Sequence, residues 1–437
     1  MREFWMQSIE VEITDLAHDG RGVARIDGKA VFVTGALKGE RARVHIVRRH
    51  RAFDEAKVET LLRTSPDRVD PVCAHFGMCG GCALQHLAPA AQIIAKERVL
   101  RENFERIGKV EPQRWLDPLA DQPWGYRRKG RLSVKWVEKK GRVLVGFREE
   151  NPRFVADLEH CHTLLPEVGE RIGALGRMIA TLEAKRSIAQ IEIAAGDDTV
   201  ALVFRHLAPL SPTDRDTLSE FGRKHGLAIL LQSGGPDSVE SLWPERIELS
   251  FHVDDAAVDI VFRPLDFVQV NAGMNQRMIA RTLELLDPQP HDRVLDLFCG
   301  LGNFSLPIAR RVAAVIGVEG DAGLIARARE NAARNGIGNI EFVAADLNAD
   351  HRDAPWAHPT ASNKLLLDPP RSGAAALLEY LPHPSVKRVL YVSCHPGSLA
   401  RDAATLVHKH GFELVAAGVM DMFPHTAHVE SIALFER

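Results

Sequence analysis

The last third of this chain alternates between short apolar runs and amphipathic stretches, and this pattern constrains the fold more than any other feature. The predicted strands are 293–298, 312–319, 340–346, 364–370 and 386–394. Helices such as 322–336 and 397–411 separate them, which is typical of a doubly wound, largely parallel, Rossmann-like sheet. Two further runs, 412–423 and 430–437, leave no room for a helix between them. They are predicted to form an antiparallel hairpin at the sheet edge.

The sequence upstream predicts two more domains, and therefore a multidomain α/β protein. Residues 1–63 contain short alternating strands and turn signals, which is typical of a small OB-like β-barrel. Residues 64–265 mix strands and helices and are expected to form a central α+β domain, which leaves 266–437 for the doubly wound domain. The stretch 91–108 has apolar residues at helical spacing and is expected to pack on that last domain.

Glycine, acidic and amide residues follow the first three predicted strands of the last domain, where doubly wound sheets bind ligands. They are Asp296, Gly300, Gly302, Asn303, Glu319 and Asp346. Two glycines let backbone approach a ligand, but Ser305 stands where a dinucleotide fingerprint has its third glycine. Glu319 suits ribose hydroxyls and Asp346 an adenine amino group, so S-adenosylmethionine fits better than NAD. The alternative is that Glu319 only caps the next helix.

The fourth and fifth predicted strands end in groups of a different chemistry. The fourth ends in "DPPR" (368–371), where Arg371 replaces the aromatic residue that amino-methyltransferases carry, which disfavours an exocyclic amine as methyl acceptor. Cys394 ends the fifth, before a helix whose N-terminus is expected to lower the pKa of the thiol. A thiolate that adds to C6 of a pyrimidine activates C5 for methylation.

This mechanism also needs a base that removes the C5 proton. Glu430 opens the final predicted strand. If that strand is antiparallel, its start lies where the parallel strands end, so Glu430 and Cys394 are expected to share one pocket. His428 is an alternative base, because its pKa is nearer neutral and a residue two positions away on a strand faces the same side.

Three of the six cysteines lie within "CAHFGMCGGC" (73–82), spaced C-x5-C-x2-C. This spacing predicts a metal or iron–sulfur site, but such a site takes four ligands. Subtracting Cys299, beside the glycines, and Cys394 leaves one further cysteine. The predicted ligands are Cys73, Cys79, Cys82 and Cys161. Gly80 and Gly81 are expected to bring backbone N–H groups close to the sulfurs, and zinc is the alternative to a cluster.

Two basic runs predict an RNA-binding surface, although the net charge of -3 does not indicate one. Residues 41–51 hold five arginines and two histidines, and 126–148 hold nine Lys or Arg with interleaved aromatic residues. The residues expected to contact RNA are Arg48, Arg49, Arg127, Arg128, Lys129 and Arg131. The alternative for both runs is a solvated sheet face.

The sequence gives no indication of a membrane or secreted protein. No apolar run is long enough to span a bilayer, and "MREFWMQSIEVEI" at the start lacks a secretory signal. Six cysteines in 437 residues do not make a disulfide framework. We expect a cytoplasmic protein without a membrane partner.

Longer motifs resemble those of the S-adenosylmethionine-dependent RNA uracil-C5 methyltransferases. They are "GRGVAR" (20–25), "CAHFGMCGGCALQH", "WGYRRKGRLS", "FVQVN", "DLFCGLGNFS", "LLLDPPRSG", "YVSCHPGSLARD" and "HTAHVESIALFER". The resemblance covers essentially the whole chain. It is strongest for the 23S ribosomal RNA branch that carries both an N-terminal TRAM barrel and a [4Fe–4S] cluster.

The resemblance implies an enzyme that methylates C5 of a uridine in 23S rRNA, the one numbered 1939. We expect a monomer, although no sequence feature indicates the oligomeric state. It implies that the methyl donor is contacted by Gln269, Phe298, Asn303, Glu319, Asp346 and Asp368. It also implies that Cys394 is the nucleophile, that Glu430 rather than His428 is the base, and that Cys161 is the fourth cluster ligand.

Other functions stay open at this point. The substrate could be another rRNA or tRNA uridine. A radical methylthiotransferase also pairs a TRAM barrel with a cluster, but its motif is C-x3-C-x2-C. A non-catalytic RNA-binding assembly factor with a structural metal would give Cys394 and Glu430 no role.

Overall fold

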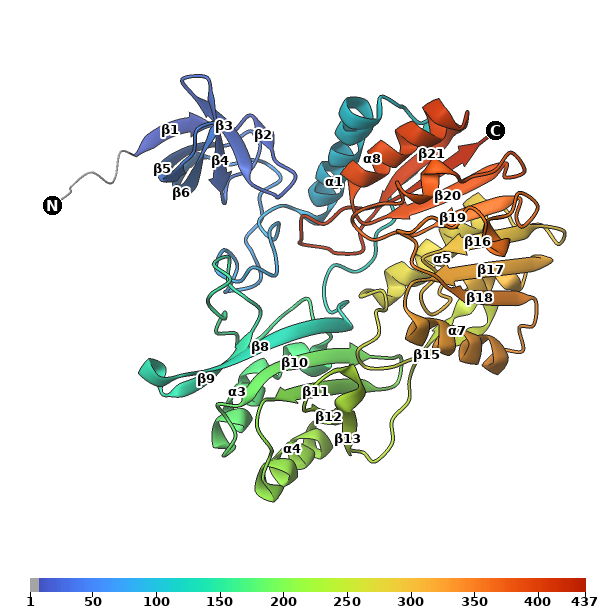
Figure 1. Ribbon diagram of the computed structural model, residues 1–437. Helices are drawn as coiled ribbons and strands as arrows, with labels where there is room; N and C mark the ends of the chain where they lie inside the picture. Colours follow the sequence, from blue (N-terminus) through green and yellow to red (C-terminus); the bar gives the residue numbers. More distant parts are fainter. Residues whose placement is uncertain (1–7) are drawn as a thin grey trace.

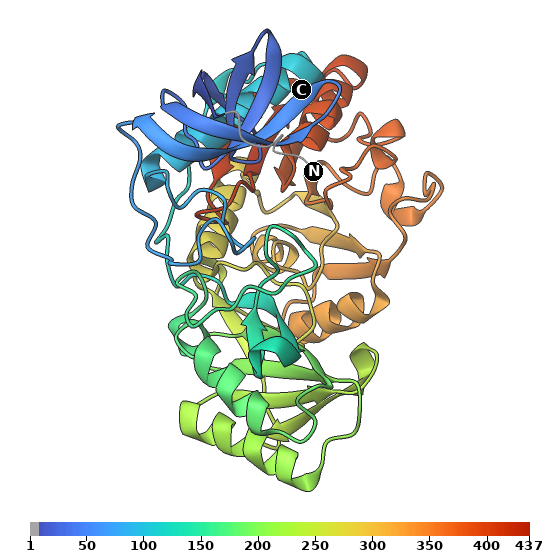
Figure 2. The same cartoon turned by 90° about the vertical axis from the view of Figure 1, so that its left-hand side faces the viewer.

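The computed structural model describes residues 8–437 and divides into three parts (Figure 1). Residues 1–7 lie outside the described residues. They belong to the predicted barrel range 1–63 and to the N-terminal segment that lacks a secretory signal. Both ribbon views place the barrel next to α1 (Pro89–Asn103), with the central domain at the opposite end of the molecule (Figures 1 and 2). Within the described residues, no helix has the length and apolar character needed to cross a bilayer.

The N-terminal part is a six-stranded barrel. Its strands are β1 (Ile9–Glu12), β2 (Asp15–Leu16), β3 (Gly22–Ile26), β4 (Lys29–Thr34), β5 (Arg41–Arg49) and β6 (Phe53–Arg63). β1 pairs with β5 at one side of the sheet and β2 pairs with β3 at the other, so the run 9–16 closes it. Alternate residues such as Val31 and Val33 fill the interior, as a period of two requires.

A connecting segment then joins the C-terminal domain. After the cysteine-rich loop, α1 continues into a π-helical turn (Phe104–Gly108), and β7 (Arg114–Trp115) follows. Leu100 and Phe104 lie in one hydrophobic cluster with residues of the C-terminal sheet, and β7 pairs with the strand Glu413–Met420 of that sheet. The stretch 91–108 thus packs on the C-terminal domain.

The central part is a six-stranded sheet in the order β13-β12-β11-β10-β8-β9. Its strands are β8 (Lys129–Val137), β9 (Arg142–Gly146), β10 (Ile188–Ala195), β11 (Val200–His206), β12 (Ala228–Gln232) and β13 (Val239–Trp243). α2 (Pro166–Gly169) precedes α3 (Ile172–Thr181), and α3 and α4 (Pro212–His225) cover one face. Leu202 and Phe204 point into that cluster, while Ala201 and Val203 belong to the core shared with the C-terminal domain.

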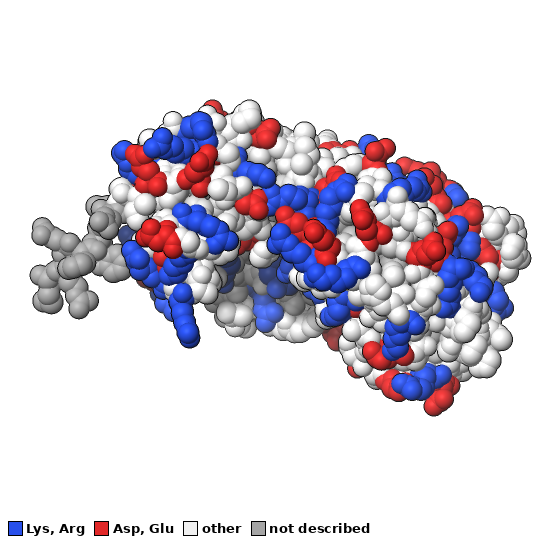
Figure 3. Space-filling model, turned by 90° about the horizontal axis from the view of Figure 1, so that it is seen from above, with Lys and Arg blue, Asp and Glu red and all other residues white. Residues whose placement is uncertain are grey.

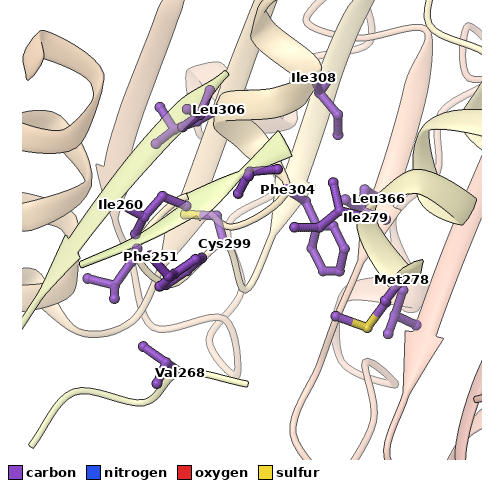
Figure 4. Packing of buried hydrophobic residues seen from close by; sticks show 14 of the residues in the cluster. Phe251, Ile260, Val268, Met278, Ile279, Cys299, Phe304, Leu306, Ile308 and Leu366 are labelled. Carbon is purple, nitrogen blue, oxygen red and sulfur yellow. The ribbon is translucent and has the colours of Figure 1, made fainter. Parts of the chain in front are cut away.

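The predicted boundary at residue 265 is wrong. The hairpin of β14 (Leu249–Val253) and β15 (Val258–Phe262) packs its apolar side chains into the C-terminal core, where Phe251 and Ile260 lie beside Cys299 (Figure 4). Asn331 further ties the hairpin to this domain by bonding the backbone N–H and carbonyl of Val261. A short hairpin cannot bury its apolar face alone. The C-terminal core that covers this face is built from residues distant in the sequence, so the sequence pattern did not reveal it.

The C-terminal part is an eight-stranded sheet in the order β18-β17-β16-β19-β20-β22-β21-β7. Its strands are β16 (Arg293–Leu297), β17 (Ala314–Glu319), β18 (Ile340–Ala344), β19 (Lys364–Leu367), β20 (Arg388–Ser393), β21 (Glu413–Met420) and β22 (Glu430–Glu436). The helices are α5 (Ala272–Leu286), α6 (Ser305–Ala309), α7 (Ala322–Arg334) and α8 (Pro396–Ala404). β16–β20 are parallel, which confirms the predicted doubly wound fold.

The predicted antiparallel pair is present, but it does not form the sheet edge. β22 is inserted between β20 and β21 and is antiparallel to both, and β7 covers the outer side of β21. The structure therefore buries the last strand in the interior of the sheet. The two-residue β7 is too short for a periodic sequence pattern to reveal it.

Candidate active site

The turn after β16 is shaped for close approach of a ligand to the backbone. Phe298 adopts a φ of 67°, a left-handed conformation that side chains rarely take. The N–H groups of Phe298 and Cys299 both donate to the Val318 carbonyl of β17, at 2.8 and 3.1 Å, which fixes the turn on the neighbouring strand. Gly300 and Gly302 follow with φ of 55° and 91°. At Gly300 a Cβ would meet no atom within 4 Å, so this position faces open space.

Glu319 ends β17 and reaches back to this turn. Its carboxylate accepts the N–H of Gly300 at 3.2 Å and that of Gly320 at 2.7 Å. Asp321, and not Glu319, caps α7, because its side chain accepts the N–H groups of Gly323 and Leu324. The alternative in which Glu319 merely caps the following helix is therefore wrong.

Two further carboxyl groups lie at the same strand ends in a poorly solvated setting. Asp296 is fully buried, and burial raises the pKa of its carboxyl to about 7. Ser305 donates to one of its oxygens, whereas the other has no partner. Asp368 follows β19, and burial with the nearby Glu319 charge raises its pKa to about 7. These carboxyl groups give the strand ends an acidic lining.

The other residues predicted to contact the methyl donor differ in their exposure to solvent. Asn303 exchanges two amide hydrogen bonds with Asn275 of α5, at 2.9 and 3.1 Å. Asp346 is exposed two residues beyond β18. Gln269 is half-buried on the segment that leads into α5, and its carbonyl accepts a bond from Arg128.

The pairing of β20 with β22 brings Cys394 and Glu430 together. Ser393 and Ser431 are direct partners in this antiparallel ladder, so Cys394 and Glu430, one step beyond, lie opposite each other at the sheet rim. The Glu430 charge contributes to raising the pKa of the Cys394 thiol, and the Asp368 charge acts on both groups. Residues 394 and 430, far apart in sequence, thus lie side by side at the rim of the sheet, where the Asp368 charge acts on both.

The expectation that the N-terminus of α8 lowers the pKa of the Cys394 thiol is wrong. Burial, with Glu430 and Asp368 adding to it, raises the pKa of Cys394 to about 11. Burial and the Asp368 charge raise the pKa of Glu430 to about 8. The N-cap of α8 is His395, whose ring accepts the Ser398 N–H, and Pro396 at the first helical position has no N–H to donate.

His428 and Glu430 are not equivalent. Glu430 is the first residue of β22 and is buried, at 8% exposure. His428 precedes the strand, is exposed and packs against Phe423, with ring centroids 5.3 Å apart. Two-residue spacing places side chains on one face only within a strand, and β22 begins after His428.

The four predicted metal ligands converge on one cavity. Cys73, Cys79, Cys82 and Cys161 all line it, together with Phe76, Phe147 and three histidines. All four are free thiols, and burial raises the pKa of Cys79 to about 11 and that of Cys82 to about 12. The Gly81 N–H donates to the Cys79 sulfur at 3.4 Å, as expected, but the Gly80 N–H donates to the Arg148 carbonyl instead. In the described part of the chain, no three His, Cys, Asp or Glu side chains are arranged to hold a single metal ion.

The basic residues divide into exposed and buried groups. Arg48 and Arg49 are exposed on β5, and the Arg131 side chain is 66% exposed while pairing with Glu192. Arg128 is 3% exposed: it stacks on Phe251 at 4.6 Å and donates to the Gln269 carbonyl. The Lys129 ammonium donates to the Pro264 carbonyl. The expectation that Arg128 and Lys129 contact RNA is therefore wrong, because both serve the contact between the central and C-terminal parts.

Arg127 lies between these two groups. It is half-buried beside the cysteine cavity, 5.6 Å above the Phe147 ring. On the face seen in Figure 3, Lys and Arg side chains are interspersed with Asp and Glu rather than gathered in a field of one sign.

Sequence reasoning missed three polar side chains: Arg371 and Lys96, whose charges act on Glu430, and Gln92, which contacts the loop that leads into Glu430. Arg371 acts electrostatically on Cys394 and Glu430 and lowers the pKa of each; "DPPR" contained this signal, but only the missing aromatic residue was considered. Gln92 and Lys96 are buried on α1 in line with Leu100. Polar residues four apart on an apolar helix face are an unusual pattern that could have been recognised.

Comparison with known proteins gives a consistent result. A family model described as "tRNA (Uracil-5-)-methyltransferase" matches residues 218–354 and 357–437, and one described as "TRAM domain" matches 6–58. The chain is 60% identical over 98% of both chains to the 23S rRNA (uracil(1939)-C(5))-methyltransferase RlmD of Xylella fastidiosa (strain 9a5c). It is 59% identical to the protein of that name from Xanthomonas axonopodis pv. citri (strain 306), covering 98% of this chain and 97% of the relative.

The fold also matches a solved structure. The tRNA (uracil-54, C5)-methyltransferase of Pyrococcus abyssi, in complex with S-adenosyl-L-homocysteine, superposes with a TM-score of 0.75 at 23% identity, covering 98% of this chain and 100% of the other.

Proposed function

This chain belongs to the RNA uracil-C5 methyltransferase family, and from that premise we propose that it transfers a methyl group from S-adenosylmethionine to C5 of a uridine in 23S ribosomal RNA, the one corresponding to uracil 1939. Relatives of that activity match it at 59–60% identity along nearly their full length. The observation that carries the proposal is the register of β20 and β22, which sets Cys394 opposite Glu430. A non-catalytic assembly factor would have no use for that pair.

We propose that the methyl donor lies against the turn after β16. The donor supplies an electrophilic methyl group when it is bound. The proposed contacts are Gln269, Phe298, Gly300, Gly302, Asn303, Glu319, Asp346 and Asp368. The acidic lining supports this assignment, because a sulfonium carries a positive charge and an adenosine offers hydroxyl and amino donors. The open space at Gly300 leaves room for a ligand against the backbone.

In the proposed reaction, Cys394 is the nucleophile and Glu430 the base. The Cys394 thiolate forms a bond to C6 of the uracil, and the electron pair of the C5=C6 bond moves to C5. C5 then bonds to the methyl group as the bond between that methyl and the donor sulfur breaks, and the electron pair of the broken bond stays on the sulfur, which leaves as a neutral thioether. Glu430 then removes the C5 proton. The C5–H electron pair restores the double bond as the C6–S bond breaks and the thiolate leaves.

We also propose that Cys73, Cys79, Cys82 and Cys161 hold a [4Fe–4S] cluster. Their convergence on one cavity supports this, because a cubane cluster takes four cysteine ligands. Nothing in the methyl transfer requires electron transfer. The role assigned to the cluster is therefore to hold the loop 73–82 to the central domain.

RNA binding is proposed for the exposed members of the basic runs. Arg48 and Arg49 of the barrel, and Arg131 with the half-buried Arg127 of the central domain, are the residues that remain available. The target uridine must leave its stack to reach Cys394. A cytoplasmic location and a monomeric state belong to the same proposal.

The decisive test uses RNA that contains 5-fluorouridine at the target. Because fluorine cannot leave C5 as a proton does, the Cys394–C6 bond persists, and wild-type protein is expected to form an adduct that survives denaturing electrophoresis. Cys394→Ala should form none and should not methylate natural RNA. Normal methylation by Cys394→Ala would overturn the mechanism. If His428→Ala, rather than Glu430→Gln, adds to C6 but fails to release product, His428 is the base.

A further inference from the structure

The loop that leads into Glu430 is held by side chains from outside the C-terminal sheet. We call residues 421–429 the base loop. At its centre, His425 has a φ of 66°, a conformation that a non-glycine residue keeps only when its surroundings enforce it. The His425 carbonyl accepts the N–H groups of Ala83 and Leu84, both at 2.9 Å. These two residues directly follow Cys82.

Gln92 of α1 makes the most extensive side-chain contact with this loop. Its side-chain oxygen accepts the His425 N–H at 2.8 Å. Its side-chain nitrogen lies 3.0 and 2.7 Å from the Leu84 and Leu87 carbonyls and 3.2 Å from the His425 ring. At 1% exposure, this amide has no water to replace a lost partner. Gln92 thus joins α1, the segment after the cysteines and the base loop through one side chain.

Other side chains also contact the loop around this point, among them Tyr126, whose hydroxyl donates to the Pro424 carbonyl at 3.0 Å. The Lys96 ammonium, one helical turn further along α1, lies 2.6 Å from the Asp421 carboxylate and 2.9 Å from the Phe423 carbonyl. The Trp124 ring stacks on His425 with centroids 3.7 Å apart. The base loop is therefore fixed at its start and at its centre.

Glu430, in contrast, has no such anchor of its own. Among residues 8–437, its carboxylate takes part in no hydrogen bond or ion pair, although it is 8% exposed. Its direction follows from the backbone that carries it. A general base must lie within hydrogen-bond reach of the proton that it removes, so the position of the base loop governs that reach.

We propose that Gln92 is a positioning residue that holds the base loop so that Glu430 can reach the C5 proton of the methylated uracil. This inference rests on the proposed function and extends it to a helix outside the C-terminal sheet. The role is confined to one step. Bond formation between Cys394 and C6, and methyl transfer, take place before Glu430 is needed, so loosening the base loop leaves them intact and delays proton removal.

The test compares Gln92→Met with Gln113→Met, an exposed glutamine in the same connecting segment. With 5-fluorouridine RNA, Gln92→Met is expected to form the covalent adduct within about twofold of the wild-type rate. On natural RNA its kcat should fall at least about tenfold while KM for RNA changes little. The methylated RNA–protein adduct, visible on a denaturing gel, should accumulate. Gln113→Met should match wild type in all three measurements.

The proposal is overturned if Gln92→Met turns over natural RNA normally. It is also overturned if adduct formation by Gln92→Met falls in parallel with kcat, because a general role of Gln92 in folding or RNA binding would produce that parallel loss. Trp124→Leu, which removes a different contact with His425, provides a second variant should Gln92→Met not fold, and the same split is expected of it. If wild-type protein forms no adduct with 5-fluorouridine RNA, the proposed function itself fails, independently of Gln92.

Discussion

At the residue scale, the proposed nucleophile, Cys394, is less acidic than an ordinary cysteine. A thiol with a pKa of about 11 is almost entirely protonated at neutral pH, and Glu430, at about 8, is largely protonated as well. Both groups must lose a proton before they can act in the proposed reaction. Arg371 opposes both shifts. The positive charge of a bound methyl donor would act in the same direction as Arg371 and lower both pKa values.

Replacing Glu430 by Gln should make Cys394 more acidic. The Glu430 carboxylate is negative only above a pH of about 8, where it disfavours the neighbouring thiolate. In Glu430→Gln, alkylation of Cys394 by iodoacetamide, followed by mass spectrometry of its peptide, should accelerate between pH 8 and 11. Arg371→Met should shift the profile the opposite way, since it removes a positive charge. Superimposable profiles for the three proteins would show that these side chains do not act on the thiol.

The sequence sufficed to pair Cys394 with Glu430, because an antiparallel last strand must begin where its parallel neighbours end. The direction of the Cys394 pKa shift was not predictable. It depends on the depth of burial and on Asp368, which joins the pair only once β19 and β20 are adjacent. Arg128 shows the same limit: its place in a basic run suggested an exposed side chain, whereas Phe251 and Gln269 enclose it.

At the element scale, the strand ends of the C-terminal sheet collect ionisable carboxyl groups whose charge depends on pH. Asp296 and Asp368 have pKa values raised to about 7 and Glu430 to about 8, so these three groups are largely uncharged at pH 6 and gain negative charge up to pH 9. A sulfonium is positive and a thioether is not. The dissociation constant of S-adenosylhomocysteine divided by that of S-adenosylmethionine should therefore rise from pH 6 to pH 9.

Calorimetric titration at several pH values measures this ratio, and Asp368→Asn is the matched comparison, because it removes one titrating charge and should flatten the rise. A ratio that stays constant in wild type would mean that the carboxyl groups do not face the sulfur.

The sequence predicted some elements better than others. The five parallel strands follow from the alternation of apolar runs and amphipathic stretches, whereas β7 and the β14–β15 hairpin depend on partners distant in the chain.

At the scale of the whole molecule, the cysteine cavity joins the loop 73–82 to residue 161 of the central domain. We expect Cys161→Ser to lose iron, to lower the melting temperature and to expose the loop to proteases, while binding of S-adenosylmethionine persists, since none of its proposed contacts lies in the cavity. Cys394→Ala is the control and should retain full iron content. Unchanged iron in Cys161→Ser would remove it from the ligand set.

The insertion of β22 between β20 and β21 also has a consequence for the order in which this protein is made. Ribosomes synthesise β22 after every other strand of its sheet, so until then β20 and β21 each present an unpaired edge. The turn after β16 can form earlier, because its partner β17 is already available. A nascent chain can therefore form the turn proposed to bind the methyl donor before the strand that carries the proposed base, Glu430, joins the sheet.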